Sequence, residues 1–81
     1  MNMKNESSYF KTSDLALTTA LSLFYPISSI DRLSSRAIFS FERQEGLDQI
    51  IQMYWRRELK VEPQAFFQQL KMVKTRLYEQ R

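Results

Sequence analysis

The pattern of apolar positions predicts a first helix near the N-terminal end of the chain. Between about Ser13 and Phe24, the apolar residues of one helical stripe follow i, i+3, i+4, i+7 spacing: Leu17, Ala20, Leu21 and Phe24. Thr12, Ser13 and Asp14 are typical of a helix start, and Pro26 stops the segment. Other apolar residues lie off the stripe, so we expect this helix to be buried on much of its circumference.

The second half of the chain predicts two further helices. A broad apolar face runs from Gln44 to about Val61, and we expect Trp55 on this face to lie in the core. A third helix begins at Pro63, which suits the first helical position, and runs to about Glu79. Its narrow apolar stripe consists of Phe66, Leu70, Val73 and Leu77. Because almost no chain separates the two helices, we expect an αα-hairpin or a sharp corner between them.

Alternating apolar and polar residues predict three strands. The segment Tyr9–Thr12 has the composition of a short strand. Residues 27–42 are typical of a β-hairpin with a turn near Leu33, Ser34 and Ser35. The clearest strand is 36–42, because its apolar and polar residues alternate as they do in a sheet with one buried face, with Ala37, Phe39 and Phe41 on the buried side.

The element order β-α-β-β-α-α predicts the fold class. We expect a small α+β protein whose three-stranded antiparallel sheet is packed by helices. A mostly helical bundle with a single β-hairpin is the alternative. A length of 81 residues predicts one domain, and we expect residues 1–8 to form a flexible N-terminal tail and residues 9–81 to form the domain.

The residue types on which most enzymes rely are missing. The chain contains no cysteine and no histidine, which removes thiolate metal sites, the commonest general base and the Ser-His-Asp and Cys-His arrangements. The single glycine, Gly46, excludes a glycine-rich phosphate loop. Glu42, Glu45 and Asp48 precede or open the second predicted helix, where we expect them to complement its positive end rather than bind a metal. We therefore predict that the protein is not an enzyme and uses no cofactor or metal.

The net charge of +3 lies wholly in the last part of the chain. From the start of the third predicted helix onward, four basic residues accompany one acidic residue, whereas the remainder has eight of each. On a helical wheel, Lys71, Lys74, Tyr78 and Arg81 fall within an arc of about 80°, and Phe67 continues the same face. Lysine and arginine neutralise phosphates, and aromatic rings stack on unpaired bases. This face predicts a nucleic-acid contact, although basic residues near a helix C-terminus also suit an ordinary solvated surface.

Two further pairs of basic residues are candidates for the same contact. Arg56 and Lys60 lie one turn apart on the polar side of the second predicted helix. Arg32 and Arg36 flank the turn of the predicted hairpin, and basic hairpin tips sometimes reach phosphates. The alternative for this second pair is that it keeps exposed strand ends from pairing with other chains.

The sequence-based hypothesis is therefore a non-catalytic, nucleic-acid-binding accessory protein that contacts the backbone of DNA or RNA. The alternative is a protein–protein adaptor or inhibitor, a homodimer included, that acts through an aromatic surface, because 14% of the residues are aromatic. No stretch of the chain approaches the roughly 18 apolar residues of a membrane span. We therefore expect a cytoplasmic protein with no membrane partner.

Several segments, taken together, resemble a known family. They are Tyr9-Phe10-Lys11-Thr12-Ser13-Asp14-Leu15 at the start, Phe39-Ser40-Phe41-Glu42 and Tyr54-Trp55 in the middle, and Lys74-Thr75-Arg76-Leu77-Tyr78 at the end. In order and spacing they resemble a small family of bacterial and viral proteins catalogued only as a domain of unknown function, over about residues 9–78. The resemblance implies no catalytic residues. It implies that Asp14 and the segment 71–78 belong to a recurring design, and that the protein is an accessory factor of mobile elements or phages.

Overall fold

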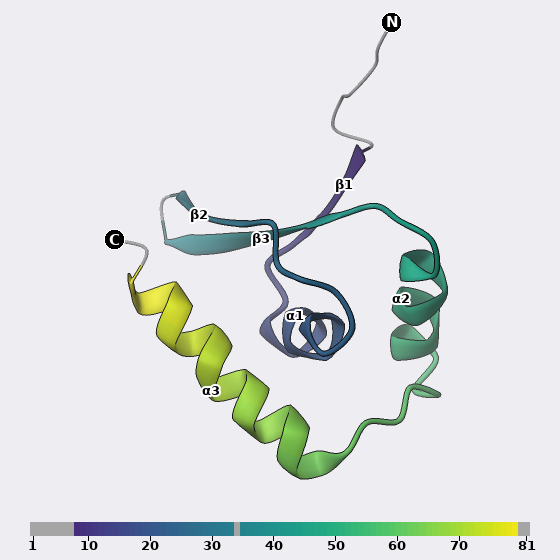
Figure 1. Cartoon of the computed structure of the whole chain (residues 1–81). Helices are drawn as coiled ribbons and strands as arrows, with labels where there is room; N and C mark the ends of the chain where they lie inside the picture. The colour runs from purple at the N-terminus through teal and green to yellow at the C-terminus, as the bar shows by residue number, and fades with distance from the viewer. Residues whose placement is uncertain (1–7, 34, 80–81) are drawn as a thin grey trace, which may run out of the picture.

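The computed structural model describes residues 8–33 and 35–79 and shows the predicted α+β fold (Figure 1). The element order is the predicted one: β1 (Tyr9–Thr12), α1 (Leu15–Ser22), β2 (Ser29–Leu33), β3 (Arg36–Glu42), α2 (Leu47–Trp55) and α3 (Pro63–Glu79). Residues 1–7 of the predicted 1–8 tail lie outside the described residues. Ser34, in the predicted hairpin turn, and Arg81 also lie outside them.

The three strands form one antiparallel sheet in the order β1-β3-β2. The register places Phe10 opposite Phe41, and both Thr12 and Ile30 opposite Phe39. Phe39 and Phe41 are 2% and 0% exposed, as the sequence predicts for the buried face of β3. Ser40, predicted to lie on the exposed face, is also buried, at 4% exposed. The core of the domain therefore lies under the central strand.

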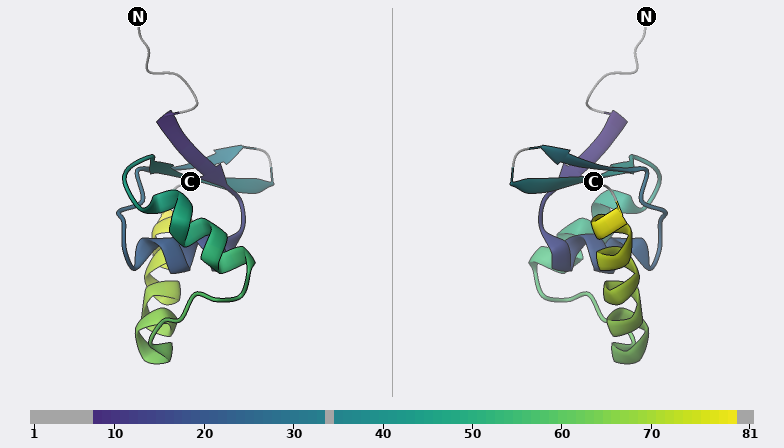
Figure 2. Two further views of the ribbon diagram at one scale, coloured as in Figure 1. Left: turned by 90° about the vertical axis from the view of Figure 1, so that its right-hand side faces the viewer. Right: turned by 90° about the vertical axis from the view of Figure 1, so that its left-hand side faces the viewer.

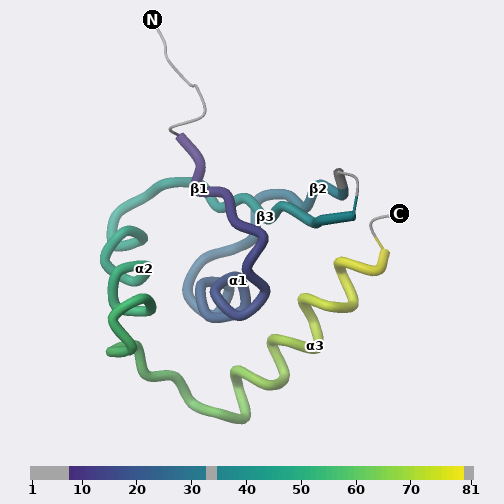
Figure 3. The backbone as a smooth tube through the Cα atoms, turned by 180° about the vertical axis from the view of Figure 1, so that it is seen from behind, coloured from purple at the N-terminus to yellow at the C-terminus, as the bar shows by residue number. Residues whose placement is uncertain are grey.

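All three helices lie on the same side of the sheet, with α1 in the middle and α2 and α3 on either side of it (Figures 1 and 3). Asp14 caps the start of α1, because its Oδ1 accepts a hydrogen bond from the backbone N–H of Leu17 at 3.0 Å. Five consecutive residues of α1, from Leu17 to Leu21, are buried, which confirms the prediction of a helix enclosed on much of its circumference. Phe24, predicted to continue the buried stripe, instead lies past the helix end and is 49% exposed.

The prediction of an αα-hairpin or a sharp corner between the last two helices is wrong, because residues 56–62 separate α2 from α3. Both α2 and α3 pack against α1, and the side views show the linker of residues 56–62 carrying the chain from one to the other (Figure 2). The physical reason is that α1 offers apolar surface on opposite sides, so each later helix buries its own apolar stripe against α1.

The helix α2 ends at Trp55, six residues before its predicted end at Val61. The backbone N–H groups of Arg57 and Glu58 donate to the carbonyl oxygens of Tyr54 and Met53 at 3.0 and 2.9 Å. Arg57 has a φ of 63°, so the chain leaves the helix through a left-handed residue in a Schellman-type turn. The apolar spacing 47, 50, 51, 54 would continue at residue 58, which is a glutamate, so the buried stripe stops where the helix does.

One buried hydroxyl in α1 offers a stability prediction. Thr18 is 0% exposed, and its Oγ1 has no hydrogen-bond partner among the residues that the structure describes. Replacing this hydroxyl with a methyl group removes an unsatisfied polar atom at nearly constant shape, so Thr18→Val should raise the free energy of unfolding by about 1 kcal/mol. Urea denaturation measures the change. The matched control is Thr19→Val, which should give no such gain because the Thr19 hydroxyl donates to the carbonyl oxygen of Leu15 at 2.8 Å.

Candidate nucleic-acid interface

The helix α3 has one buried stripe, and most of its other residues are exposed. Pro63 is its first residue, and the Glu62 carboxylate accepts a hydrogen bond from the backbone N–H of Ala65 at 2.7 Å, which caps the helix start. On the inner side, Val73 is 1% exposed, and its stripe neighbours are half-buried. On the outer side, four exposed residues follow the same spacing one position later, and we call them the α3 outer stripe: Phe67, Lys71, Lys74 and Tyr78.

The α3 outer stripe is held facing outward by contacts on the opposite side of the helix. Gln69 Nε2 donates to Ser22 Oγ at 3.0 Å, which ties α3 to the end of α1. Within the stripe, Lys71 Nζ lies 5.0 Å from the centroid of the Phe67 ring, a cation–π contact. Phe67 and Tyr78 are 57% and 60% exposed. A cation and a ring therefore already stand together on the surface, with a second lysine and a second ring along the same line.

The hairpin arginines lie at the C-terminal end of this stripe. Arg32 Nη1 donates to the carbonyl oxygen of Leu77, in the last turn of α3, at 3.4 Å. Arg36 lines a shallow depression that Leu77 also lines, and its Nη2 donates to Ser13 Oγ at 3.0 Å. Both arginines are exposed, so the structure brings the predicted hairpin candidates next to the predicted helix candidates.

Arg56 and Lys60 were predicted to lie on the second helix, but α2 ends at Trp55, before both of them. Both belong to the α2–α3 linker, residues 56–62, and both are exposed. Lys60 stands between Leu59 and Val61, which turn inward and line a cleft beside α3. Lys60 therefore lies beside the cleft that also includes Phe67, at the N-terminal end of the α3 outer stripe, whereas Arg56 is not among the lining residues of this cleft. Arg81, the remaining predicted contact, lies outside the described residues.

A cleft of about 510 Å³ opens between α1, α2, the linker and α3. It is mostly apolar, and Phe67 belongs both to the cleft and to the α3 outer stripe. Burial, and next the negative charge of Asp14, raise the pKa of Tyr54 above its ordinary value, so this phenol is neutral at pH 7. The residues lining the cleft are Ala20, Tyr54, Arg57, Leu59, Val61, Pro63, Phe66 and Phe67. The sequence-based prediction missed both the cleft and Arg57.

Trp55 does not lie in the core, which corrects its predicted place. The side chain is 60% exposed and meets the Tyr54 ring edge-on, with 5.0 Å between the ring centroids. It is the last residue of α2 and lies at the edge of the face that carries Leu47 and Ile51 into the core, where no neighbour among the described residues covers it.

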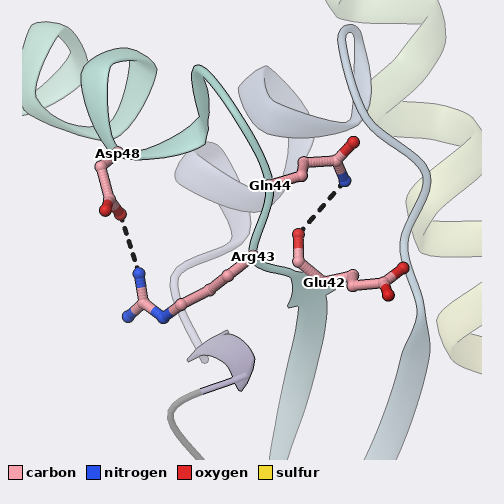
Figure 4. Close-up of polar contacts among 4 residues, drawn as sticks. All are labelled: Glu42, Arg43, Gln44 and Asp48. Atoms are coloured by element: carbon pink, nitrogen blue, oxygen red, sulfur yellow. Dashed lines mark hydrogen bonds and ion pairs between the residues drawn. The ribbon is translucent and has the colours of Figure 1, made fainter.

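Of the predicted acidic residues Glu42, Glu45 and Asp48, Asp48 makes a local contact through its carboxylate, whereas Glu42 and Glu45 accept hydrogen bonds through their backbone carbonyls. Asp48 accepts a hydrogen bond from Arg43 Nη1 at 2.8 Å, and Gln44 Nε2 donates to the backbone carbonyl of Glu42 at 3.2 Å (Figure 4). Asp48 lies in the first turn of α2, where a carboxylate favours the positive helix end. Among residues 8–33 and 35–79, no group of three acidic, histidine or cysteine side chains is arranged to hold a metal ion.

Comparison with known proteins identifies the family. A family model described as "Domain of unknown function (DUF5659)" matches residues 7–79. The chain belongs to this family. The match spans β1 to α3, so the α+β fold described above is the fold of the matched DUF5659 region in this chain. No curated protein and no solved structure gives a match. None of the helices in the described part of the chain is both long and apolar enough to cross a membrane.

Proposed function

We propose that this DUF5659 protein is a cytoplasmic, non-catalytic accessory protein that binds DNA or RNA through the α3 outer stripe. The observation that supports the proposal is the exposure of two lysines and two aromatic rings on one line of one helix. Lysines release counterions when they neutralise phosphates, and exposed rings offer stacking surfaces to bases. The protein would act as a subunit of a larger protein–nucleic acid assembly of a phage or mobile element.

The arrangement of charge along α3 suits a nucleic-acid backbone. From Phe67 to Tyr78 the stripe extends about 16 Å along the helix axis. Arg32 and Arg36 lie at one end of this line, and Arg57 and Lys60 lie at the other, so cations continue beyond both of its ends. Contacts of this kind go to phosphates and fix position without reading sequence, so we expect binding with little sequence preference.

A salt series tests the proposal. Binding of the wild-type protein should be measured with single-stranded and double-stranded DNA and RNA probes between about 50 and 200 mM salt. For two to four neutralised phosphates, the plot of log K against log salt should have a slope of about −1.5 to −3.5 for the probes that bind. Absence of binding for all four probes at the lowest salt contradicts the proposal. That result would favour the alternative, a protein–protein adaptor or inhibitor. The 60% exposure of the Trp55 side chain supports this alternative. Light scattering would show whether the protein forms a homodimer.

A further inference from the structure

We propose that the nucleic acid is single-stranded and that one unpaired base enters the cleft beside Phe67. The inference rests on the proposed function and adds to it the class of strand and the place of one base. Three features of the cleft support it: its aromatic lining, the cations around it, and the backbone conformation of Arg57.

The first feature is the shape and lining of the cleft. Its volume of about 510 Å³ leaves ample room for one planar base and its sugar, and its walls include the rings of Tyr54, Phe66 and Phe67. Phe67 is 57% exposed, so part of its ring faces solvent and is open to a stacking partner. A base paired and stacked within a duplex has no free face, whereas a base of a single strand has two. The cleft therefore selects for an unpaired base.

The second feature is the charge at the cleft. Arg57 lines it on the linker side, and Lys71 stands over the Phe67 ring on the α3 side, with Nζ 5.0 Å from the ring centroid. Lys60 follows between two lining residues and is exposed. The linker carboxylates of Glu58 and Glu62 are both exposed and offset part of this charge, and Glu62 also caps α3. Asp14 adds a negative charge near Tyr54 on the other side of the cleft. Cations on two sides of an aromatic cleft match a base whose two flanking phosphates lie outside it.

The third feature is the left-handed conformation of Arg57. With a φ of 63°, it is the one non-glycine residue at positive φ among those that the structure describes. Glycine is favoured at this position of a Schellman-type turn, and a residue with a Cβ atom costs roughly 1 kcal/mol there. The turn needs a left-handed residue at this position but not an arginine, so the choice of arginine over glycine has a cost in stability. We attribute this choice to the side chain, whose guanidinium group stacks on bases and donates to phosphates.

The test compares two single-stranded probes of equal charge: a twelve-nucleotide thymidylate chain and a twelve-residue chain of abasic sites. The wild-type protein should bind the thymidylate chain about tenfold more tightly, because only that probe has bases to stack. Phe67→Ala should abolish most of this preference. Trp55→Ala, which removes an equally exposed aromatic ring outside the cleft lining, should keep it. Arg57→Gly should weaken the binding of both probes while the melting temperature stays the same or rises, which separates a contact role from a structural one.

The outcomes distinguish this inference from the proposed function. Equal affinity of the wild type for both probes, an unchanged preference in Phe67→Ala, or equally tight binding of a twelve-base-pair duplex overturns the base-in-cleft inference. Each of these results leaves the proposed function standing if Lys71→Glu still weakens binding. Absence of binding to every probe overturns both.

Discussion

Phe41→Ala should lower the free energy of unfolding by about 3–5 kcal/mol. Phe41 is 0% exposed, lies on the central strand β3 and faces Phe10 across the strand pair. Truncation to alanine removes its burial and leaves a cavity that the strands on either side of β3 cannot close. A domain of 81 residues has a total stability of only about 4–12 kcal/mol, so a large fraction of the variant should be unfolded at 37 °C.

Urea denaturation of Phe41→Ala and of a matched variant, Phe24→Ala, measures this effect. Phe24 is the same residue type but is 49% exposed, so its truncation should cost about 1 kcal/mol or less. If the two variants lose equal stability, the core does not lie under β3 as described.

Reversing both lysine charges of the α3 outer stripe should nearly abolish nucleic-acid binding. Lys71→Glu with Lys74→Glu removes two phosphate contacts and adds two repulsive carboxylates. We expect at least a tenfold loss of affinity at about 100 mM salt and a salt slope that is shallower by about 1.5. The fold should survive, because both side chains are exposed and a carboxylate in the C-terminal half of a helix costs only a few tenths of a kcal/mol.

The single variants Lys71→Glu and Lys11→Glu provide the control for net charge. Lys11 is exposed on β1, and it alternates with the inward-facing Phe10 and Thr12, so it points to the sheet face away from the helices. Both variants change the net charge of the protein by the same amount. Lys71→Glu should weaken binding clearly more than Lys11→Glu, and an equal loss would mean that only the overall charge matters.

The sequence predicted correctly those elements whose buried side follows from the local spacing of apolar residues. The strand β3 and the helix α3 have the predicted bounds, because alternation in one and a continuous apolar stripe in the other determine which side is buried. The same stripe placed Phe67, Lys71 and Lys74 on the exposed side correctly. The prediction extended α2 to Val61, although the glutamate at position 58 interrupts its apolar spacing. The left-handed conformation of Arg57, through which the chain leaves the helix, has no local signal in the sequence.

Features that depend on packing between distant segments could not be predicted in this way. The αα-hairpin was a reasonable expectation from chain order, but α1 competes as a packing partner for both later helices. The cleft is built from α1, α2, the linker and α3 together, so its lining has no contiguous signal in the sequence. Trp55 shows the same limit, since a place at the edge of an apolar face does not say whether a neighbour covers it.

The most direct test of the central claim is a titration of ¹⁵N-labelled protein with the twelve-nucleotide thymidylate chain, followed by backbone amide chemical shifts at low salt. We predict that the largest shift changes fall on Phe67, Lys71, Lys74 and Tyr78, with little change at Lys11 and Asp31 on the exposed side of the sheet strands. Shift changes concentrated on β1 and β2, or no shift changes with either this probe or a twelve-base-pair duplex at millimolar concentration, would contradict the account that α3 carries a nucleic-acid interface.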